Sequence, residues 1–197
     1  MPYTFRPATC ADLPILREWL ATPEVVRWWG EPAEQYALLE EDLGNPLMVM
    51  RIVAFERRPF AYVQDYDVHT WPQPHFADLP QGARGIDAFI GAPDMIGQGH
   101  GAAFLRERAS KLIAAGAPLV AIDPDAANLR ARRAYAKAGF VETRVAPTPA
   151  GDVAVMVFET SPRSKSPVSD STERFACRQQ PTCVRGEVKR NEGEGQH

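Results

Sequence analysis

The sequence of 197 residues lacks the features that mark several large protein classes. No stretch approaches about eighteen consecutive apolar residues, so no transmembrane helix and no membrane partner are expected. Cysteine is scarce: Cys10, Cys177 and Cys183 are the only three and show no zinc-like spacing, so we expect neither a disulfide framework nor a metal site. The first residues lack a basic segment followed by an apolar one, which favours a cytoplasmic location.

A strong charge of either sign is also missing, since 22 Lys and Arg stand against 25 Asp and Glu. Residues 161–197 hold seven basic and five acidic residues, which leaves 15 basic and 20 acidic residues in 1–160. This acidic excess argues against a nucleic-acid partner, which requires a basic surface for phosphates. The same excess suits a polycationic small molecule.

The composition divides the chain near residue 160. Residues 161–197 are rich in Ser, Pro, Gly and charge, and they bury too little apolar surface to offset the entropy of ordering, so a disordered tail is predicted. Residues 1–160 are predicted to form one domain. Only its middle alternates strand and helix, which indicates an α/β (α+β) domain with a mixed sheet flanked by helices.

Periodicity, caps and turn residues predict the individual elements. Strands are expected at 3–6, 47–56, 60–68, 85–91, 117–123, 140–146 and 153–160. Helices are expected after Thr9, at 23–29, at 32–43, after residue 99 and at 125–139. Hairpin turns are predicted at 57–59 and 147–152. The proline-rich stretch 68–84 is predicted to be a long loop, and loops of this length inside a domain are usually functional.

Three glycines, Gly97, Gly99 and Gly101, lie between the predicted strand 85–91 and a helix. The exposed N–H groups and the dipole of a helix N-terminus can hold a phosphate, and glycine lets the backbone approach it closely. A Rossmann fingerprint would need a third glycine at position 104, which is Phe, and a P-loop would need a following Lys. A turn without a ligand is the alternative that the residues leave open.

Two segments resemble the signatures of the GNAT superfamily of N-acetyltransferases. Residues 96–101, IGQGHG, match its acyl-CoA signature [RQ]-G-x-G-x-[GA], except that Ile96 replaces Arg or Gln. Residues 128–140 match N-x-x-[AS]-x-x-x-[YF]-x-K-x-G-F in full. The resemblance implies a GNAT fold with a splayed mixed sheet, and acetyl-CoA as co-substrate with its pyrophosphate on the glycine-rich turn.

The chain is similar, over roughly residues 1–160, to the aminoglycoside 6'-N-acetyltransferases. It shares with them VVRWWG (25–30), YVQDY (62–66), RGIDAF (84–89) and TPAGDVAVMVF (148–158). The resemblance implies acetyl transfer to the 6'-amine of aminoglycoside antibiotics, and hence resistance, by a monomer or homodimer. One alternative is a GNAT acyltransferase acting on a polyamine, a siderophore hydroxylysine or a protein N-terminus. Another is a non-catalytic CoA-binding sensor.

Two residues are the catalytic candidates. An alkylammonium must lose a proton before it can attack a thioester. Asp87, on the strand that runs into the glycine-rich turn, is predicted to accept it, and the alternative is a strand-edge Asp that caps a loop. The resemblance implies that Tyr135 donates a proton to the leaving sulfur. Because Tyr135 shares a helical stripe with Ala131, Ala134 and Ala138, a core tyrosine is the alternative.

The remaining site residues are predicted to bind the two substrates. The resemblance assigns the main chain of Phe89 and Ile90 and the side chain of Asn128 to the pantetheine arm; the alternative for Asn128 is a helix start. The turn residues predicted to bind the cofactor are Ile96, Gly97, Gln98, Gly99, His100 and Gly101.

Acceptor binding is predicted for a second set of side chains, which supply carboxylates and flat apolar surfaces. These residues are Trp28, Trp29, Gln64, Tyr66, Asp87 and Asp123. Gln64 and Tyr66 share one face of a strand and Asp65 lies on the other. One of the two tryptophans is expected in the core, and a helix cap is the alternative for Asp123. The side chains of His69, His75 and His100 are predicted to be solvated.

Overall fold

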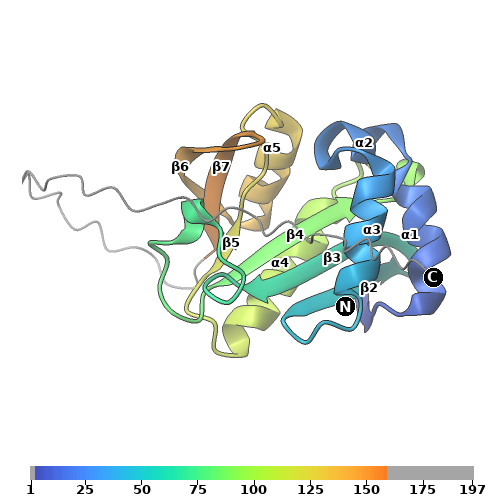
Figure 1. Ribbon diagram of the computed structural model, residues 1–197, viewed down its shortest axis with the longest axis horizontal. Coiled ribbons are helices and arrows are strands. Elements are labelled where there is room, and N and C mark those ends of the chain that lie inside the picture. The colour runs from blue at the N-terminus through green and yellow to red at the C-terminus, as the bar shows by residue number, and fades with distance from the viewer. Residues whose placement is uncertain (1–2, 159–197) are drawn as a thin grey trace, which may run out of the picture. The chain divides into compact units, whose positions relative to one another are not determined.

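The computed structural model describes residues 3–158, so the predicted tail at 161–197 lies outside the described residues. The strands are β1 (Tyr3–Pro7), β2 (Met48–Phe55), β3 (Arg58–Asp67), β4 (Arg84–Ile90), β5 (Val120–Ile122), β6 (Val141–Thr148) and β7 (Gly151–Phe158). They form one sheet in the order β1-β2-β3-β4-β5-β7-β6 (Figure 1). β4 and β5 are parallel and all other neighbours antiparallel, which confirms the predicted mixed sheet.

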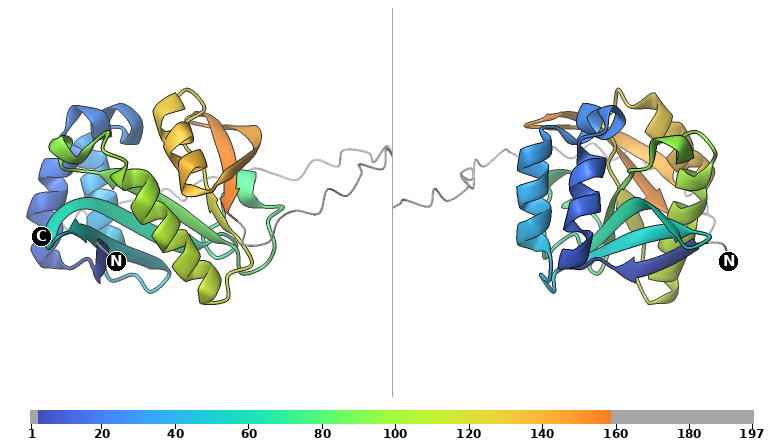
Figure 2. Two further views of the ribbon diagram at one scale, coloured as in Figure 1. Left: turned by 180° about the vertical axis from the view of Figure 1, so that it is seen from behind. Right: turned by 90° about the vertical axis from the view of Figure 1, so that its right-hand side faces the viewer.

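Helices cover both faces of this sheet. They are α1 (Leu13–Leu20), α2 (Pro23–Trp29), α3 (Pro32–Asp42), α4 (His100–Ala114) and α5 (Leu129–Ala138), with 3₁₀ helices at Cys10–Asp12, Pro74–Phe76 and Pro93–Met95. α1 to α3 lie on one face and α4 and α5 on the other (Figure 2). None of the helices within residues 3–158 is long and apolar enough to cross a membrane.

Strand periodicity divides the core into two layers. Along β2, Ile52 packs under α1 to α3 while its neighbour Val53 packs under α4, and both are fully buried. Along β3, Tyr62 and Val63 divide in the same way. Because successive side chains of a strand point to opposite faces, runs such as 48–55 are apolar, apart from Arg51, where both faces are covered.

Both predicted hairpins are found, and each turn is only two residues long. In the first, Phe55 pairs with Arg58, so the turn consists of Glu56 and Arg57, with φ values of 47° and 72°. A two-residue hairpin turn needs this left-handed backbone and normally takes it from Asn or Gly, so residue type gives no signal here. In the second, Thr148 pairs with Gly151, so β6 and β7 extend through most of the predicted turn at 147–152.

The sheet opens between β4 and β5. These strands pair only at Arg84 with Val120 and Gly85 with Ala121, and β5 ends at Ile122 while β4 continues to Ile90. Beyond Gly85, β4 stays paired with β3 on one side, but its edge toward β5 has no strand partner among the described residues. This divergence gives the splayed sheet predicted from the sequence and provides the space for a site.

Candidate active site

Two adjoining cavities lie where β4 and β5 separate. The first has a volume of about 350 Å³ and extends from the glycine-rich turn to α5. The second has a volume of about 340 Å³ and lies over β3, β4 and the segment after β5. The residues that line both are Trp28, Trp29, Ala88, Asn128 and Tyr135. Their shared wall allows two ligands, each in its own cavity, to meet at that wall.

The glycine-rich turn forms one wall of the first cavity through Ile96, Gly97, Gly99 and Gly101. Gly97 and Gly99 have φ values of 82° and 88°, and Gly99 precedes the first residue of α4. A Cβ at either glycine would meet no atom within 4 Å, so the backbone conformation requires glycine and internal packing does not. The first N–H groups of α4 have no intrahelical acceptor and favour an anion.

Two residues of this turn direct their side chains elsewhere. Gln98 donates a hydrogen bond to the main-chain oxygen of Asp94. His100 Nδ1 lies 2.8 Å from the hydroxyl oxygen of Tyr3, so its imidazole packs toward β1. Neither residue lines the first cavity, and each can contribute only main-chain groups there. The prediction of a fully solvated His100 side chain is wrong, because the imidazole is half-buried against tyrosine and phenylalanine rings.

Main-chain groups of β4 face the first cavity from the open sheet edge. The N–H of Arg84 donates to Leu119, on the β5 side, whereas the N–H of Gly91 donates to Phe60, on the β3 side. Since this direction alternates along a strand, the N–H and C=O of Ala88 and Ile90 face the opening. Those of Phe89 face β3, so Ala88 and Ile90, and not the predicted Phe89, expose main-chain groups at this edge.

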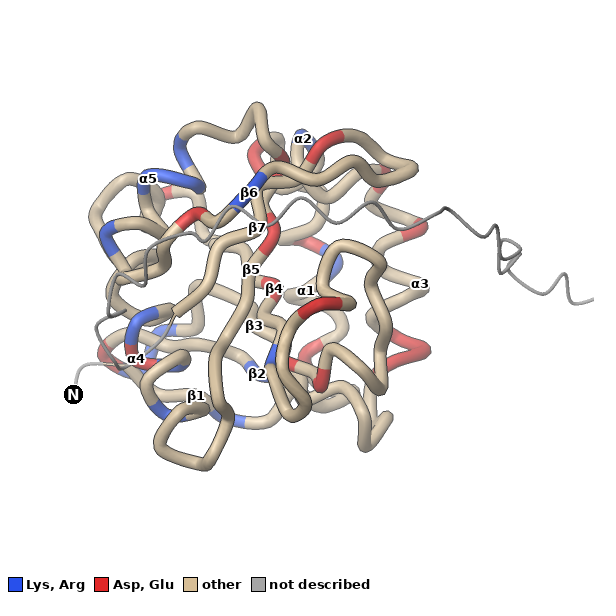
Figure 3. The backbone as a smooth tube through the Cα atoms, turned by 90° about the vertical axis from the view of Figure 1, so that its left-hand side faces the viewer, with Lys and Arg blue, Asp and Glu red and all other residues tan. Residues whose placement is uncertain are grey.

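Three basic side chains of α5 also line the first cavity. Arg130, Arg133 and Lys137 are three and four residues apart, which places them on one face of the helix. Figure 3 shows the basic positions of α5 in blue and a run of acidic positions on α3 in red. The first cavity therefore combines helix N–H groups with cationic side chains, a combination that binds phosphate.

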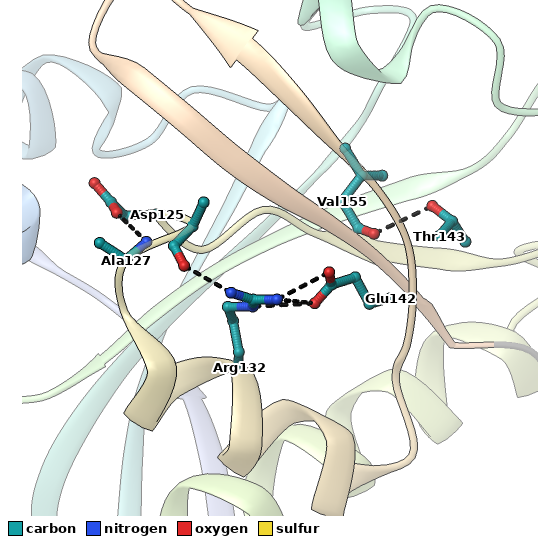
Figure 4. Close-up of polar contacts among 7 residues, drawn as sticks. Asp125, Ala127, Arg132, Glu142, Thr143 and Val155 are labelled. Carbon is teal, nitrogen blue, oxygen red and sulfur yellow. Dashed lines mark hydrogen bonds and ion pairs between the residues drawn. The ribbon is translucent and has the colours of Figure 1, made fainter.

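The opposite side of α5 is anchored to the sheet. Arg132 donates from Nε and Nη2 to the carboxylate of Glu142 on β6 at 3.0 and 2.8 Å, and from Nη1 to the main-chain oxygen of Ala126 at 2.7 Å (Figure 4). Asn128 Oδ1 accepts from the N–H of Ala131 at 3.0 Å. Asn128 is thus the helix cap that the sequence left open as an alternative, and it also lines both cavities.

Asp87 lies on the floor of the second cavity in a fixed orientation. Gln64 Nε2 donates to Asp87 Oδ2 at 2.8 Å, and the Tyr62 hydroxyl donates to Gln64 Oε1 at 2.6 Å. Burial raises the pKa of Asp87 to about 7, and the negative charge of Asp123 adds to this effect, while the Gln64 hydrogen bond opposes it. Near neutral pH this carboxyl can both accept and release a proton.

Asp123 lies beyond the end of β5 and lines the same cavity. His75 Nε2 lies 2.7 Å from Asp123 Oδ2, and the two side chains are 5% and 21% exposed. The prediction of a solvated His75 is therefore wrong. His69 also contacts protein, since its Nε2 lies 2.9 Å from the main-chain oxygen of Leu79. The helix-cap alternative for Asp123 is wrong as well, because Asn128 has that role.

Tyr135 stands at the boundary between the cavities. Its ring packs against Phe140 with a centroid distance of 6.3 Å, which accounts for its place in the apolar stripe of α5. Burial raises the pKa of Tyr135, and the negative charges of Asp87 and Asp123 raise it further. The phenol therefore stays protonated at neutral pH and can donate a proton to a base in either cavity.

The side chains on the two faces of β3 lie in different surroundings, as the alternation predicted. Gln64 and Tyr66 lie on the face of the second cavity, where Tyr66 is 3% exposed and packs over Gly85. Asp65 lies on the other face, accepts from Arg108 Nε at 2.9 Å and pairs with Arg84 at 2.7 Å. Gln64 lines the second cavity, whereas Tyr66, which was also predicted to contact the acceptor, is buried and lines neither cavity.

The two tryptophans at the end of α2 differ in their surroundings. The ring of Trp29 packs edge-on against Phe89 with a centroid distance of 4.8 Å and also contacts Tyr62. Trp28 packs under the guanidinium of Arg27 at the rim. Trp29 packs against the core, but both tryptophans are half-buried and both rings line the two cavities.

Charge divides the two cavities. The first has the glycine-rich turn, the three basic residues of α5 and a single acidic residue, Glu24, which pairs with Arg130 at 3.3 Å, whereas Asp87, Asp123 and Asp125 line the second. An anion in the first and a cation in the second would meet beside Tyr135. Residues 3–158 hold no group of three or more His, Cys, Asp or Glu side chains arranged for a metal ion. A carboxyl with a raised pKa, Asp87, and a protonated phenol, Tyr135, therefore lie where two bound ligands would meet.

Some residues of this arrangement were missed by reasoning from the sequence. His75 and Asp123 are 48 residues apart, and no spacing rule joins a loop histidine to a strand end. Tyr62 precedes Gln64 by two residues, so their shared strand face could have indicated the contact. The spacing of Arg130, Arg133 and Lys137 within the second signature motif could have indicated that they share one face of the helix.

Comparisons with known proteins agree with the fold and the site. The family described as the acetyltransferase (GNAT) domain matches residues 9–147. The aminoglycoside N(6')-acetyltransferase type 1 of Klebsiella pneumoniae is 30% identical over 171 residues, covering 78% of this chain and 81% of that protein. Because the family match spans more than half of the sequence, the chain belongs to the GNAT acetyltransferase family.

The chain is also similar in structure to solved aminoglycoside acetyltransferases. The structure of AAC(6')-Ib in complex with paromomycin and acetyl-CoA has a TM-score of 0.71 and 29% identity, covering 81% of this chain and 94% of that one. The complex of the same enzyme with coenzyme A and kanamycin has a TM-score of 0.70 and 30% identity, covering 80% and 95%. The predicted GNAT fold and the resemblance to aminoglycoside 6'-N-acetyltransferases are confirmed.

Proposed function

We propose that the protein transfers the acetyl group of acetyl-CoA to the 6'-amine of aminoglycoside antibiotics and so confers resistance to them. The observation that carries this proposal is the charge division at the site. A basic cavity with a helix N-terminus suits the phosphates of acetyl-CoA, and an acidic cavity suits an acceptor with several ammonium groups. Relatives about 30% identical act on, or bind, these two ligands.

Residues of this chain fit each part of acetyl-CoA. The N–H groups at the start of α4, with Arg130, Arg133 and Lys137, hold the phosphates. The main chain of Ala88 and Ile90 pairs with the pantetheine arm as an added strand would. Asn128 lines the shared wall, where the arm ends and the thioester lies within reach of Tyr135.

Asp87 and Tyr135 then move the protons of the reaction. Asp87 accepts a proton from the 6'-ammonium, directly or through a water molecule, and leaves a neutral amine. The amine nitrogen bonds to the acetyl carbon as the carbon–sulfur bond breaks, and Tyr135 donates its phenolic proton to the departing sulfur. The acylated nitrogen then releases its extra proton, through water, to the Tyr135 oxygen, which leaves a neutral amide and a neutral phenol. Asp123 and Asp125 hold other ammonium groups of the acceptor, and Gln64 keeps Asp87 oriented.

The test is release of CoA thiol from acetyl-CoA in the presence of different acceptors. We expect turnover with kanamycin and tobramycin and little with spermidine, lysine derivatives or peptides with a free N-terminus. Preferred turnover of a polyamine or a peptide would assign the second cavity to that acceptor instead. Binding of CoA without turnover of any amine would favour a sensor. The monomer-or-homodimer state and the cytoplasmic location remain predictions.

A further inference from the structure

We propose that His75 is a positioning residue that holds the Asp123 carboxylate in the acceptor cavity and thereby sets the affinity for a cationic acceptor. This inference rests on the proposed function of the same cavity. His75 comes from the long 68–84 loop, outside the strands and helices that carry the other site residues. Its side chain does not line either cavity, so it acts through Asp123.

The hydrogen bond between the two side chains leaves one carboxylate oxygen for the acceptor. His75 Nε2 contacts Asp123 Oδ2 at 2.7 Å, and among residues 3–158 Oδ1 accepts no hydrogen bond. With only 5% of its side chain exposed, His75 has little access to water and depends on this partner. The pair fixes the direction in which Oδ1 points, which is what an ammonium group in the cavity would recognise.

The loop that carries His75 is itself held in place. Arg144 on β6 donates from Nη2 to the main-chain oxygen of His75 at 2.7 Å and also pairs with Asp78. The next residue, Phe76, is fully buried, and its ring packs against the His75 imidazole with a centroid distance of 4.4 Å. The backbone at His75 is thus fixed from two sides, so the imidazole presents Nε2 to Asp123 in one orientation.

The position of Asp123 matters because a second carboxylate shares the cavity. Asp87 and Asp123 repel each other when both are ionised, and a free Asp123 would turn away toward water. The His75 donor keeps Asp123 in place when the cavity is empty, so an incoming polycation meets a preorganised pair of carboxylates. Loss of the donor should therefore weaken acceptor binding and leave the binding of acetyl-CoA unchanged, because none of these residues lines the first cavity.

The experiment compares His75→Leu with His75→Gln in steady-state assays on kanamycin. Leu removes the donor, and we expect the KM for kanamycin to rise about tenfold or more, as for loss of a hydrogen bond to a charged group. Gln carries an amide N–H at the position of Nε2, so His75→Gln should restore the KM to within about threefold of the wild type. The KM for acetyl-CoA should change by less than about twofold in both variants. His69→Leu, in the same loop, is the matched control and should leave the KM for kanamycin within about threefold.

A double-mutant cycle separates this role from a general effect on the loop. In an Asp123→Asn background, His75→Leu should add no further rise in the KM for kanamycin. Equal effects of Leu and Gln, equal changes in both KM values, or additive effects with Asp123→Asn would each overturn the proposal. If His75→Leu fails to bind acetyl-CoA in calorimetry, His75→Asn replaces it, since that amide is too short to reach Asp123. The turnover of kanamycin by the wild-type protein, measured in parallel, tests the proposed function separately. Without that turnover the proposed function fails, whereas the role of His75 is judged only by the difference between the variants and the wild type.

Discussion

Replacing Asp87 with Asn should abolish most of the activity and at the same time stabilise the fold. Asn has the same shape, and its oxygen can still accept the hydrogen bond from Gln64 Nε2, so the cavity keeps its geometry. The amide cannot accept the proton of the ammonium. We therefore expect kcat to fall by about two to four decades, as for loss of a general base, while acetyl-CoA binds normally.

The gain in stability follows from the pKa of Asp87, which rises from 3.8 to about 7 on folding. The folded state holds this proton more tightly than the unfolded chain, so the stability contributed by the protonated carboxyl is complete below about pH 4. It is lost as the pH rises through about 7. A change of about three pKa units corresponds to an upper bound of about 4 kcal/mol.

Water at the cavity mouth and the coupling to Asp123 reduce that figure, and we expect about 1–2 kcal/mol. For a domain of this size, the gain corresponds to a Tm about 2–8 °C higher for Asp87→Asn at pH 8. The assay is thermal unfolding of both proteins at pH 4 and pH 8, beside kinetics with kanamycin. The two Tm values should converge at pH 4. A lower Tm for Asp87→Asn at pH 8, or near-normal kcat, would refute the reasoning about this carboxyl.

The other expectations concern both cavities. Tyr135→Phe should lower kcat by about two decades and leave both KM values within about threefold, because the phenol donates a proton to the leaving sulfur. An unchanged kcat would mean that Tyr135 is only a packing residue. Gly99→Val, at a φ of 88°, should raise the Kd for acetyl-CoA by about tenfold or more in calorimetry, and an unchanged Kd would remove the anion site from this turn. The value of kcat/KM for kanamycin should rise with pH up to about 7 and then level off, since Asp87 must be ionised to accept the proton. Raising salt from about 0.05 to 0.5 M should raise the KM for kanamycin more than that for acetyl-CoA, and equal responses would count against acidic recruitment.

Sequence patterns predicted the fold well where the pattern depends on a single helix or strand. Residues 128–140 indicated a capped helix with Tyr135 on its apolar face, and α5 has that form. Alternation along β3 separated Gln64 from Asp65, and the structure connects them to Asp87 and Arg108 respectively. Both signals depend on periodicity or capping within one element, which a sequence records directly.

Long-range contacts and backbone conformations without a residue signature could not be predicted. The loop 68–84 brings His75 to Asp123 only through tertiary packing, so a solvated histidine was the natural but wrong expectation. The turn at Glu56 and Arg57 has a left-handed backbone without Asn or Gly. The sequence predicted that the main chain of Phe89 faces the open edge of β4, whereas that of Ala88 does. The direction of each main-chain group depends on the strand register, which the sequence does not record.

Neomycin and paromomycin offer the most direct measurement of the central claim, because one carries an amine and the other a hydroxyl at the 6' position. The two acceptors share their remaining amines, so charge and shape are nearly matched. With acetyl-CoA we predict rapid CoA release with neomycin, a product acetylated at the 6' nitrogen by NMR, and no turnover of paromomycin although it binds. Efficient acetylation of paromomycin, or acetylation of neomycin at another amine, would contradict transfer to the 6'-amine beside Asp87.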